Sequence, residues 1–325
     1  MIEIKLEGHL GACGAPPAVW HKACYGNGEA DQLLDQKAGE TMKTGVHAKA
    51  RYVLAALAGT AALLGAFASF DASAQTSIRD TRHNLGTSNS TGTSSFSGTG
   101  EVCVFCHTPH GSNTGVAAPL WNKAVPTTTY SMYSTGGSAT IDGTEATVGS
   151  VSLACLSCHD GSLAVATMIN QPGSGGYNPA GAVMAGTWTN PSTTDGVDPA
   201  TGMIRASSIQ NIGGNLVNDH PISIQYCGGG LTGSGTTVSG TCGDRDFTQP
   251  KTRVVNGNQV FWVDTAGGTA DVREKTDIAL YTRAGGPTGP MVECASCHDP
   301  HTAVNPTFLR VANVSSNLCL SCHVK

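Results

Sequence analysis

Charged and aromatic residues are both scarce in this chain of 325 residues. Asp, Glu, Lys and Arg make up 13% of the chain, and Phe, Trp and Tyr make up 6%. A core built from side chains alone would therefore be thin for this length, so something else must fill part of the interior. The formal net charge is −5, and no basic run or patch is present, which argues against a nucleic-acid partner.

The beginning of the chain is expected to be absent from the mature protein. Residues 42–74 contain a basic start, an apolar stretch over 53–70 and then Ala72-Ser73-Ala74. This order is typical of a secretory signal peptide that is cleaved after Ala74, and a retained membrane anchor is the alternative. Residues 1–41 precede this better start and are interpreted as a misassigned leader. We expect an exported protein without a stable membrane anchor, extracellular or at the cell surface, with the periplasm as the alternative.

Eight of the twelve cysteines form four Cys-x-x-Cys pairs, and a histidine follows each pair directly. Because the chain has 11 histidines, chance would place one after a given pair only about 3% of the time. The motifs are Cys103/Cys106 with His107, Cys155/Cys158 with His159, Cys294/Cys297 with His298, and Cys319/Cys322 with His323.

This pattern predicts four covalently bound haem c groups. The two thiols of a pair can each bond to one vinyl group of a haem, and the next histidine then ligates the iron as its proximal ligand. Zinc ribbons need no histidine directly after the pair. Thioredoxin-type pairs usually occur singly on a βαβ pattern, and plain disulfides explain the histidines no better.

Four histidines remain in the predicted mature chain, one for each haem. Two of them recur in the same frame, three residues beyond a proximal histidine, in CHTPH and CHDPH. A histidine in this frame lies on the same side of its own haem as the proximal one, so we expect it to ligate a neighbouring haem. The candidate distal ligands are His83, His110, His220 and His301.

The frame suggests one particular pairing of these ligands. We expect His110 to ligate the haem of His159 and His301 to ligate the haem of His323, which leaves His83 and His220 for the other two haems.

Bis-histidine ligation at every iron would leave no open position for a substrate. It also favours lower reduction potentials than His/Met ligation. The prediction is therefore an electron carrier with no catalytic residues rather than an enzyme. Surface or core roles for single histidines remain possible, as does substitution of one imidazole by a methionine, Met132, Met168, Met184, Met203 or Met291.

The composition predicts a mostly irregular, loop-rich fold with short helices and a few small β-hairpins around the haems. The predicted parts of the mature chain are an arm over 75–100 with a distal histidine, a haem 1/haem 2 module over 101–170, an insertion over 171–290 and a haem 3/haem 4 module over 291–325.

Smaller elements can be predicted within these parts. Residues 160–170 have a helical pattern, and 171–218 are interrupted by Gly, Pro and Asn, as in a loop. Residues 253–263 predict a hairpin that turns at Asn256-Gly257. Cys227 and Cys242 enclose a Gly-Ser-Thr-rich loop and are most simply a disulfide after export.

Several strings resemble a known family. They are EVCVFCHTPHG followed by APLWNK, NDHPISIQY, VECASCHDPH with FLR and NLCLSCH near the end, and RHNL near the mature start. They are similar to the multihaem cytochromes with CxxCHxPH motifs and, more narrowly, to the tetrahaem extracellular cytochrome filaments of metal-reducing bacteria, of the OmcE type.

The resemblance implies a homopolymer whose subunits join head to tail, with one continuous stack of haems. It also implies that a histidine of one subunit ligates a haem of the next, and His83 is the candidate, with His220 as the alternative. An interface that does not close gives an open fibre. The partner would be another redox protein or an external electron acceptor.

Three functions from different classes therefore remain. They are an extracellular electron conduit, a soluble periplasmic tetrahaem shuttle, and a multihaem reductase with one open or Lys-ligated haem. The equal numbers of spare histidines and haems argue against the reductase.

Overall fold

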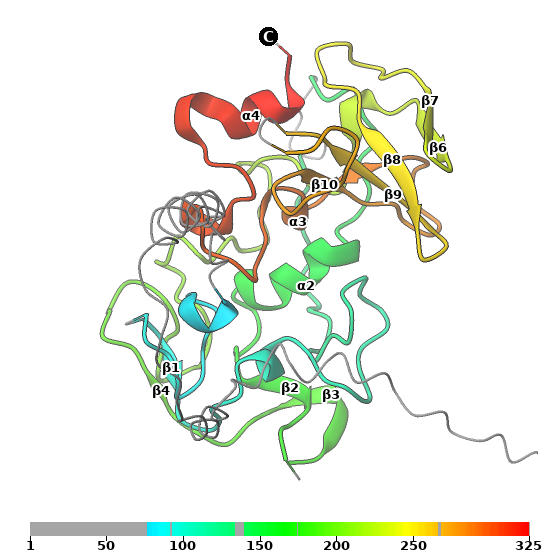
Figure 1. The fold of residues 1–325 in the computed structure, drawn as a ribbon. Helices are drawn as coiled ribbons and strands as arrows, with labels where there is room; N and C mark the ends of the chain where they lie inside the picture. Colours follow the sequence, from blue (N-terminus) through cyan, green and yellow to red (C-terminus); the bar gives the residue numbers. More distant parts are fainter. Residues whose placement is uncertain (1–76, 92, 134–139, 174, 266–267, 325) are drawn as a thin grey trace, which may run out of the picture. The chain divides into compact units, whose positions relative to one another are not determined.

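The computed structural model describes residues 77–91, 93–133, 140–173, 175–265 and 268–324. The predicted leader and signal peptide lie outside these residues. Contacts along the backbone divide the chain after Ala74, and the described residues all belong to the unit Gln75–Lys325. Short helices and small sheets are joined by long loops in this unit (Figure 1), which confirms the predicted fold class.

The helices of the described residues are all short. The α-helices are α2 (Ser150–His159), α3 (Cys294–Cys297) and α4 (Asn317–Cys322). The 3-10 helices are η1 (Ile78–Asp80), η2 (Cys103–Phe105), η3 (Tyr226–Gly228), η4 (Pro306–Phe308) and η5 (Val314–Ser316). Across the described ranges, no helix is long and apolar enough to cross a membrane.

The strands pair in small antiparallel sheets. They are β1 (Ser95–Phe96), β2 (Thr167–Asn170), β3 (Tyr177–Val183), β4 (Trp188–Thr189), β5 (Ile224–Gln225), β6 (Leu231–Ser234), β7 (Thr237–Gly240), β8 (Lys251–Val255), β9 (Asn258–Val263), β10 (Ile278–Leu280) and β11 (Met291–Val292). The pairs are β1 with β4, β2 with β3, β5 with β11 and β6 with β7, and one three-stranded sheet has the order β10-β9-β8.

The predicted hairpin at Asn256-Gly257 is confirmed. Strands β8 and β9 pair in register from Val255 opposite Asn258 outward. Asn256 and Gly257 have φ angles of 49° and 79°, the positive values that a type I′ turn requires at both central positions. Short-range turn chemistry was enough to predict this element.

The predicted helix over 160–170 is wrong. Helix α2 ends at His159, and Gly161 adopts a φ of 69° while the Asp160 side chain accepts hydrogen bonds from the backbone and hydroxyl of Ser162. The chain then enters β2, whose residues bond to Asn122 on a distant loop. Strand pairing of β2 with β3, together with the hydrogen bonds to Asn122, therefore overrides the local helical pattern.

The described part of the N-terminal arm packs against the predicted insertion. Strand β1 pairs with β4, so that Phe96 lies opposite Trp188, and the two rings have centroids 5.0 Å apart. Phe105, within the first haem motif, joins the same buried cluster. The arm, which is too poor in apolar residues to pack alone, is thus ordered by the insertion.

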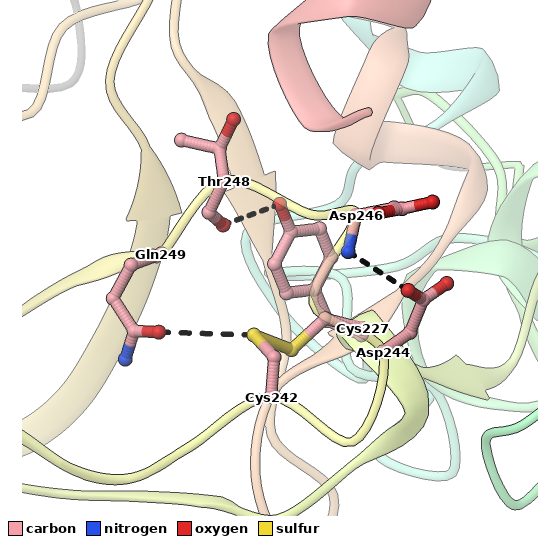
Figure 2. The surroundings of a disulfide bond; sticks show 7 residues. Cys227, Cys242, Asp244, Asp246, Thr248 and Gln249 are labelled. Carbon is pink, nitrogen blue, oxygen red and sulfur yellow. Dashed lines mark hydrogen bonds between the residues drawn. A yellow bond between two sulfur atoms is a disulfide. The ribbon is translucent and has the colours of Figure 1, made fainter. Parts of the chain in front are cut away.

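A disulfide joins Cys227 to Cys242 and encloses the β6–β7 hairpin. Figure 2 shows its surroundings: the Asp244 carboxylate accepts a hydrogen bond from the backbone of Asp246 at 2.8 Å. Tyr226, beside the bridge, donates its hydroxyl to the Thr248 carbonyl at 2.8 Å. The hydroxyl of Tyr226 therefore joins the start of the disulfide loop to the segment 244–248.

A buried ion pair connects the second and third haem motifs. Glu293, directly before α3, is fully buried and bonds to Arg283 at 2.6 Å. Ser152 of α2 donates to the other carboxylate oxygen at 2.5 Å. Burial raises the pKa of Glu293, and the bonds from Ser152 and Arg283 oppose this rise. The Glu293 carboxylate thus joins the two attachment segments, and it is stable when buried only because Ser152 and Arg283 bond to it.

Arg283→Leu should lower the free energy of unfolding by at least about 3 kcal/mol, because it leaves the Glu293 carboxylate buried without its counter-ion. Denaturant unfolding followed by circular dichroism measures the change. Arg253→Leu, at an exposed position of β8, is the matched control and should change stability little. Equal stabilities of the two variants would contradict the role of the ion pair.

Replacing Cys227 and Cys242 together by serine should lower the free energy of unfolding by about 3 kcal/mol, because a cross-link over this separation restricts the unfolded chain. Thermal or denaturant unfolding with and without a reductant measures the effect. The reductant should destabilise the parent and leave the double variant unchanged. A parent that is insensitive to reductant would argue against a stabilising bridge.

Candidate haem-attachment sites

All four CxxCH motifs lie on a single helical turn or at the end of a short helix. The first is on η2, the second at the end of α2, the third on α3 and the fourth on α4. On a helical turn, residues three apart share one face. Each pair of thiols is therefore presented on one side, with the histidine at the end of the turn.

Three of the motifs are held by the same backbone clamp. In each, a returning segment donates one backbone hydrogen bond to the carbonyl of the second cysteine and accepts one from the residue after the histidine. The backbone N–H groups that donate to the cysteine carbonyls are those of Asn122 (to Cys106), Arg310 (to Cys297) and Thr248 (to Cys322), each at 2.8 Å. The carbonyls that accept from the residue after the histidine are those of Leu120 (from Thr108), Phe308 (from Asp299) and Asp246 (from Val324), also at 2.8 Å.

The histidine of each clamped motif is extended and forms a β-bridge with its returning segment. The bridges are His107 with Trp121, His298 with Leu309, and His323 with Phe247. The clamp of the fourth motif comes from the insertion, far away in sequence. Sequence reasoning missed these segments, although the strings LWN and FLR, noted only for their resemblance, are two of them.

The second motif is held differently. His159 is the last residue of α2, and its carbonyl accepts a hydrogen bond from the backbone of Ile212 at 2.7 Å. The buried Asp160 follows and accepts hydrogen bonds from Thr128 and Tyr130. Helix α2 therefore supplies the support that a returning segment supplies elsewhere.

Three proximal histidines have one ring nitrogen already bonded. Nδ1 donates to a backbone carbonyl in each: His107 to Pro119 at 2.7 Å, His159 to Gln210 at 2.8 Å and His298 to Thr307 at 2.7 Å. This bond determines the tautomer and leaves Nε2 as the metal-binding nitrogen. Burial also lowers the pKa of His107 and His159, which keeps the rings in the neutral form that binds metal.

Two candidate distal histidines are anchored by the turn of the third motif. The His83 ring bonds through Nδ1 to the Pro300 carbonyl at 3.2 Å and stacks on Phe308 with centroids 4.4 Å apart. Burial lowers the pKa of His83 to about 4. The His301 ring bonds through Nδ1 to the Asp299 carboxylate at 3.1 Å, and this bond is the main reason that the pKa of Asp299 falls to about 2.

Two pairs of these rings meet, and they are not the pairs expected from the motif frame. His301 lies beside His107, with ring centroids 6.2 Å apart and planes 13° apart. His83 lies beside His159, also at 6.2 Å, with planes 68° apart. The other two candidates, His110 and His220, are exposed to solvent.

The haem cysteines of successive motifs are neighbours. Cys106 lies near enough to Cys158 to raise its own pKa beyond the effect of burial. A hydrogen bond between Cys155 and Cys294 raises the pKa of Cys155 and lowers that of Cys294. In the last pair of motifs, Cys297 lies near Cys319 and Cys322. The four motifs thus follow one another in space in their chain order.

The residues at these motifs fit haem c. At the second and third motifs, two cysteine thiols stand beside an imidazole whose Nδ1 is bonded to a carbonyl, which leaves Nε2 for a metal. In addition, the Trp121 indole N–H is buried and has no hydrogen-bond partner among the described residues. Trp121 packs edge-on to His107 with centroids 6.0 Å apart, so a polar edge of a group held by His107 is a suitable acceptor.

A comparison with protein families agrees with this chemistry. Residues 289–325 match the family described as the doubled CXXCH motif. No curated protein matches the chain. The motifs and this match support a multihaem c-type cytochrome with covalently bound haem c.

Asn122→Ala should weaken the clamp of the first motif and lower the free energy of unfolding of the haem-loaded protein by about 2 kcal/mol. The side chain donates to the Val104 and Asn170 carbonyls at 2.7 and 2.9 Å and accepts from the Asn170 backbone at 2.9 Å. Denaturant unfolding measures the loss. Asn313→Ala, at an exposed position, is the control, and equal stabilities would contradict the prediction.

Proposed function

We propose that this protein is an electron carrier that passes electrons through four bis-histidine haem c groups. The observation that carries the proposal is the succession of the four attachment motifs, in which the cysteines of each motif lie beside those of the next. Haems attached at neighbouring turns come close together, and close haems exchange electrons rapidly. The haem iron supplies the one-electron chemistry when bound, and the protein positions it.

The protein scaffold supports this role through its histidines. The proximal rings are held by backbone carbonyls, and burial keeps His107 and His159 neutral. Such bonds orient the imidazole and tune the potential of the iron. Methionine is the less suitable iron ligand here, because two of the candidates, Met168 and Met184, are buried in an apolar cluster. The proposal therefore predicts an electron carrier in which no haem iron has an open coordination position.

We further propose that the chain is a subunit of an extracellular filament that carries electrons to an external acceptor. Export rests on the signal-like residues 42–74, and polymerisation rests on the resemblance to tetrahaem filament cytochromes. Because the His83 ring lies beside His159 of the same chain, we assign the ligand donated to a neighbouring subunit to one of the two candidates that are in neither ring pair, His110 or His220.

Negative-stain microscopy of the secreted fraction should show filaments of the haem-loaded protein, because a head-to-tail interface does not close. Intact mass should show four covalent haems per chain. His110→Ala or His220→Ala should abolish the filaments while all four haems remain attached. Filaments from both variants would remove these residues as donors.

Two other results would favour the remaining functions. Discrete small particles at high protein concentration would defeat the filament proposal and favour the periplasmic shuttle. Carbon monoxide binding to the reduced filament, or cyanide binding to the oxidised filament, would reveal an open iron and favour a reductase.

A further inference from the structure

The turn of the third motif, residues 299–301, lies between two other parts of the chain that carry histidines, the first motif and the N-terminal arm. His301 projects from this turn to the His107 ring of the first motif. The Pro300 carbonyl of the same turn bonds to His83 of the N-terminal arm. One short segment therefore positions two imidazoles, and each faces a proximal histidine of a different motif.

The spacing of both ring pairs matches two ligands on one iron. An imidazole nitrogen binds a transition metal at about 2 Å, so the centres of two rings on opposite sides of one iron are roughly 6 Å apart. His107 and His301 are 6.2 Å apart, and so are His159 and His83. Near-parallel rings packed face to face would lie closer than His107 and His301 do, as the 4.4 Å stack of His83 on Phe308 shows.

The remaining ring contacts leave the correct nitrogen for the metal. Nδ1 is already bonded in His107, His301, His159 and His83, to Pro119, Asp299, Gln210 and Pro300 respectively. Each ring therefore offers Nε2, the nitrogen on its far side. Asp299 also lies near Arg310, at 4.0 Å, so its carboxylate is itself positioned.

We infer that His301 is the distal ligand of the haem attached at Cys103/Cys106 and that His83 is the distal ligand of the haem attached at Cys155/Cys158. Asp299 and Phe308 are positioning residues for these two ligands. The inference rests on the proposed haem attachment and deepens it, because it joins the arm and the C-terminal module to the first two haems through iron. It replaces the pairing of His301 with the haem of His323.

The two pairs differ in the angle between their rings, and this difference has a spectroscopic signature. The g-anisotropy of a low-spin ferric haem depends on the angle between its imidazole planes. The planes of His107 and His301 are 13° apart, and those of His159 and His83 are 68° apart. Oxidised protein should therefore show a rhombic signal from near-parallel rings and a separate signal of larger maximum g from crossed rings.

The decisive experiment combines the ligand variants with loss of single haems. His301→Ala should retain all four haems by intact mass, lose a rhombic signal and bind carbon monoxide at one more haem than its parent. In a background without the first haem, Cys103→Ser with Cys106→Ser, His301→Ala should add no carbon monoxide site. In a background without the fourth haem, Cys319→Ser with Cys322→Ser, it should still add one.

His83→Ala provides the matching test at the second haem. It should remove a signal of large maximum g and add a carbon monoxide site, except in the background of Cys155→Ser with Cys158→Ser. If the alanine variants do not fold, His301→Met keeps a ligand and should raise the potential of one haem, because thioether ligation favours higher potentials. That rise should vanish when the first haem is absent.

Each outcome decides one proposal. A new carbon monoxide site, or a shifted potential for the methionine variant, that persists without the first haem would overturn the assignment of His301. The same result for His83→Ala without the second haem would overturn the assignment of His83. Absence of covalent haem from the intact mass would instead defeat the proposed function.

Discussion

The backbone clamp around the attachment turns is the constraint on which the rest of the site depends. A CxxCH segment is one helical turn long and cannot hold its histidine in place alone. The returning segment that contains Trp121 and Asn122 supplies this support at the first motif, and the segment 307–310 does so at the third. Because each clamp uses main-chain hydrogen bonds, it tolerates very different side chains.

Buried polar groups take much of the role that an extensive apolar core has in other domains. Asn122 connects the first motif to β2, and Lys123, only 2% exposed, donates to the Val165 and Thr167 carbonyls. Glu293 joins the third motif to α2 through Ser152, and its carboxylate is paired with Arg283. Buried polar groups are costly when unpartnered and stable when fully bonded. A chain poor in aromatic residues can therefore be well ordered around its motifs.

Elements that depend on neighbouring residues were predictable, and elements that depend on distant partners were not. Asn256-Gly257 is sufficient for the β8–β9 turn, because the two residues accept positive φ at little cost. The helical pattern of residues 160–170 misled the prediction, since β2 pairs with β3 and accepts its remaining support from Asn122, almost 50 residues away. The returning segments escaped notice for a related reason: main-chain bonds leave little trace in the side-chain pattern.

The cofactor class, and the histidines predicted to be proximal ligands, followed from local sequence, because two thiols and an imidazole within five residues contain the whole attachment chemistry. Which distal imidazole faces which proximal one depended on the tertiary structure. The turn 299–301 reaches the first motif and the arm only after the chain has folded back. The shared frame of CHTPH and CHDPH suggested that His301 serves the haem of His323, whereas folding places the His301 ring beside that of His107. A proximal ligand can be predicted from local sequence because it adjoins its attachment cysteines. A distal ligand comes from elsewhere in the chain, so it can be assigned only from the fold.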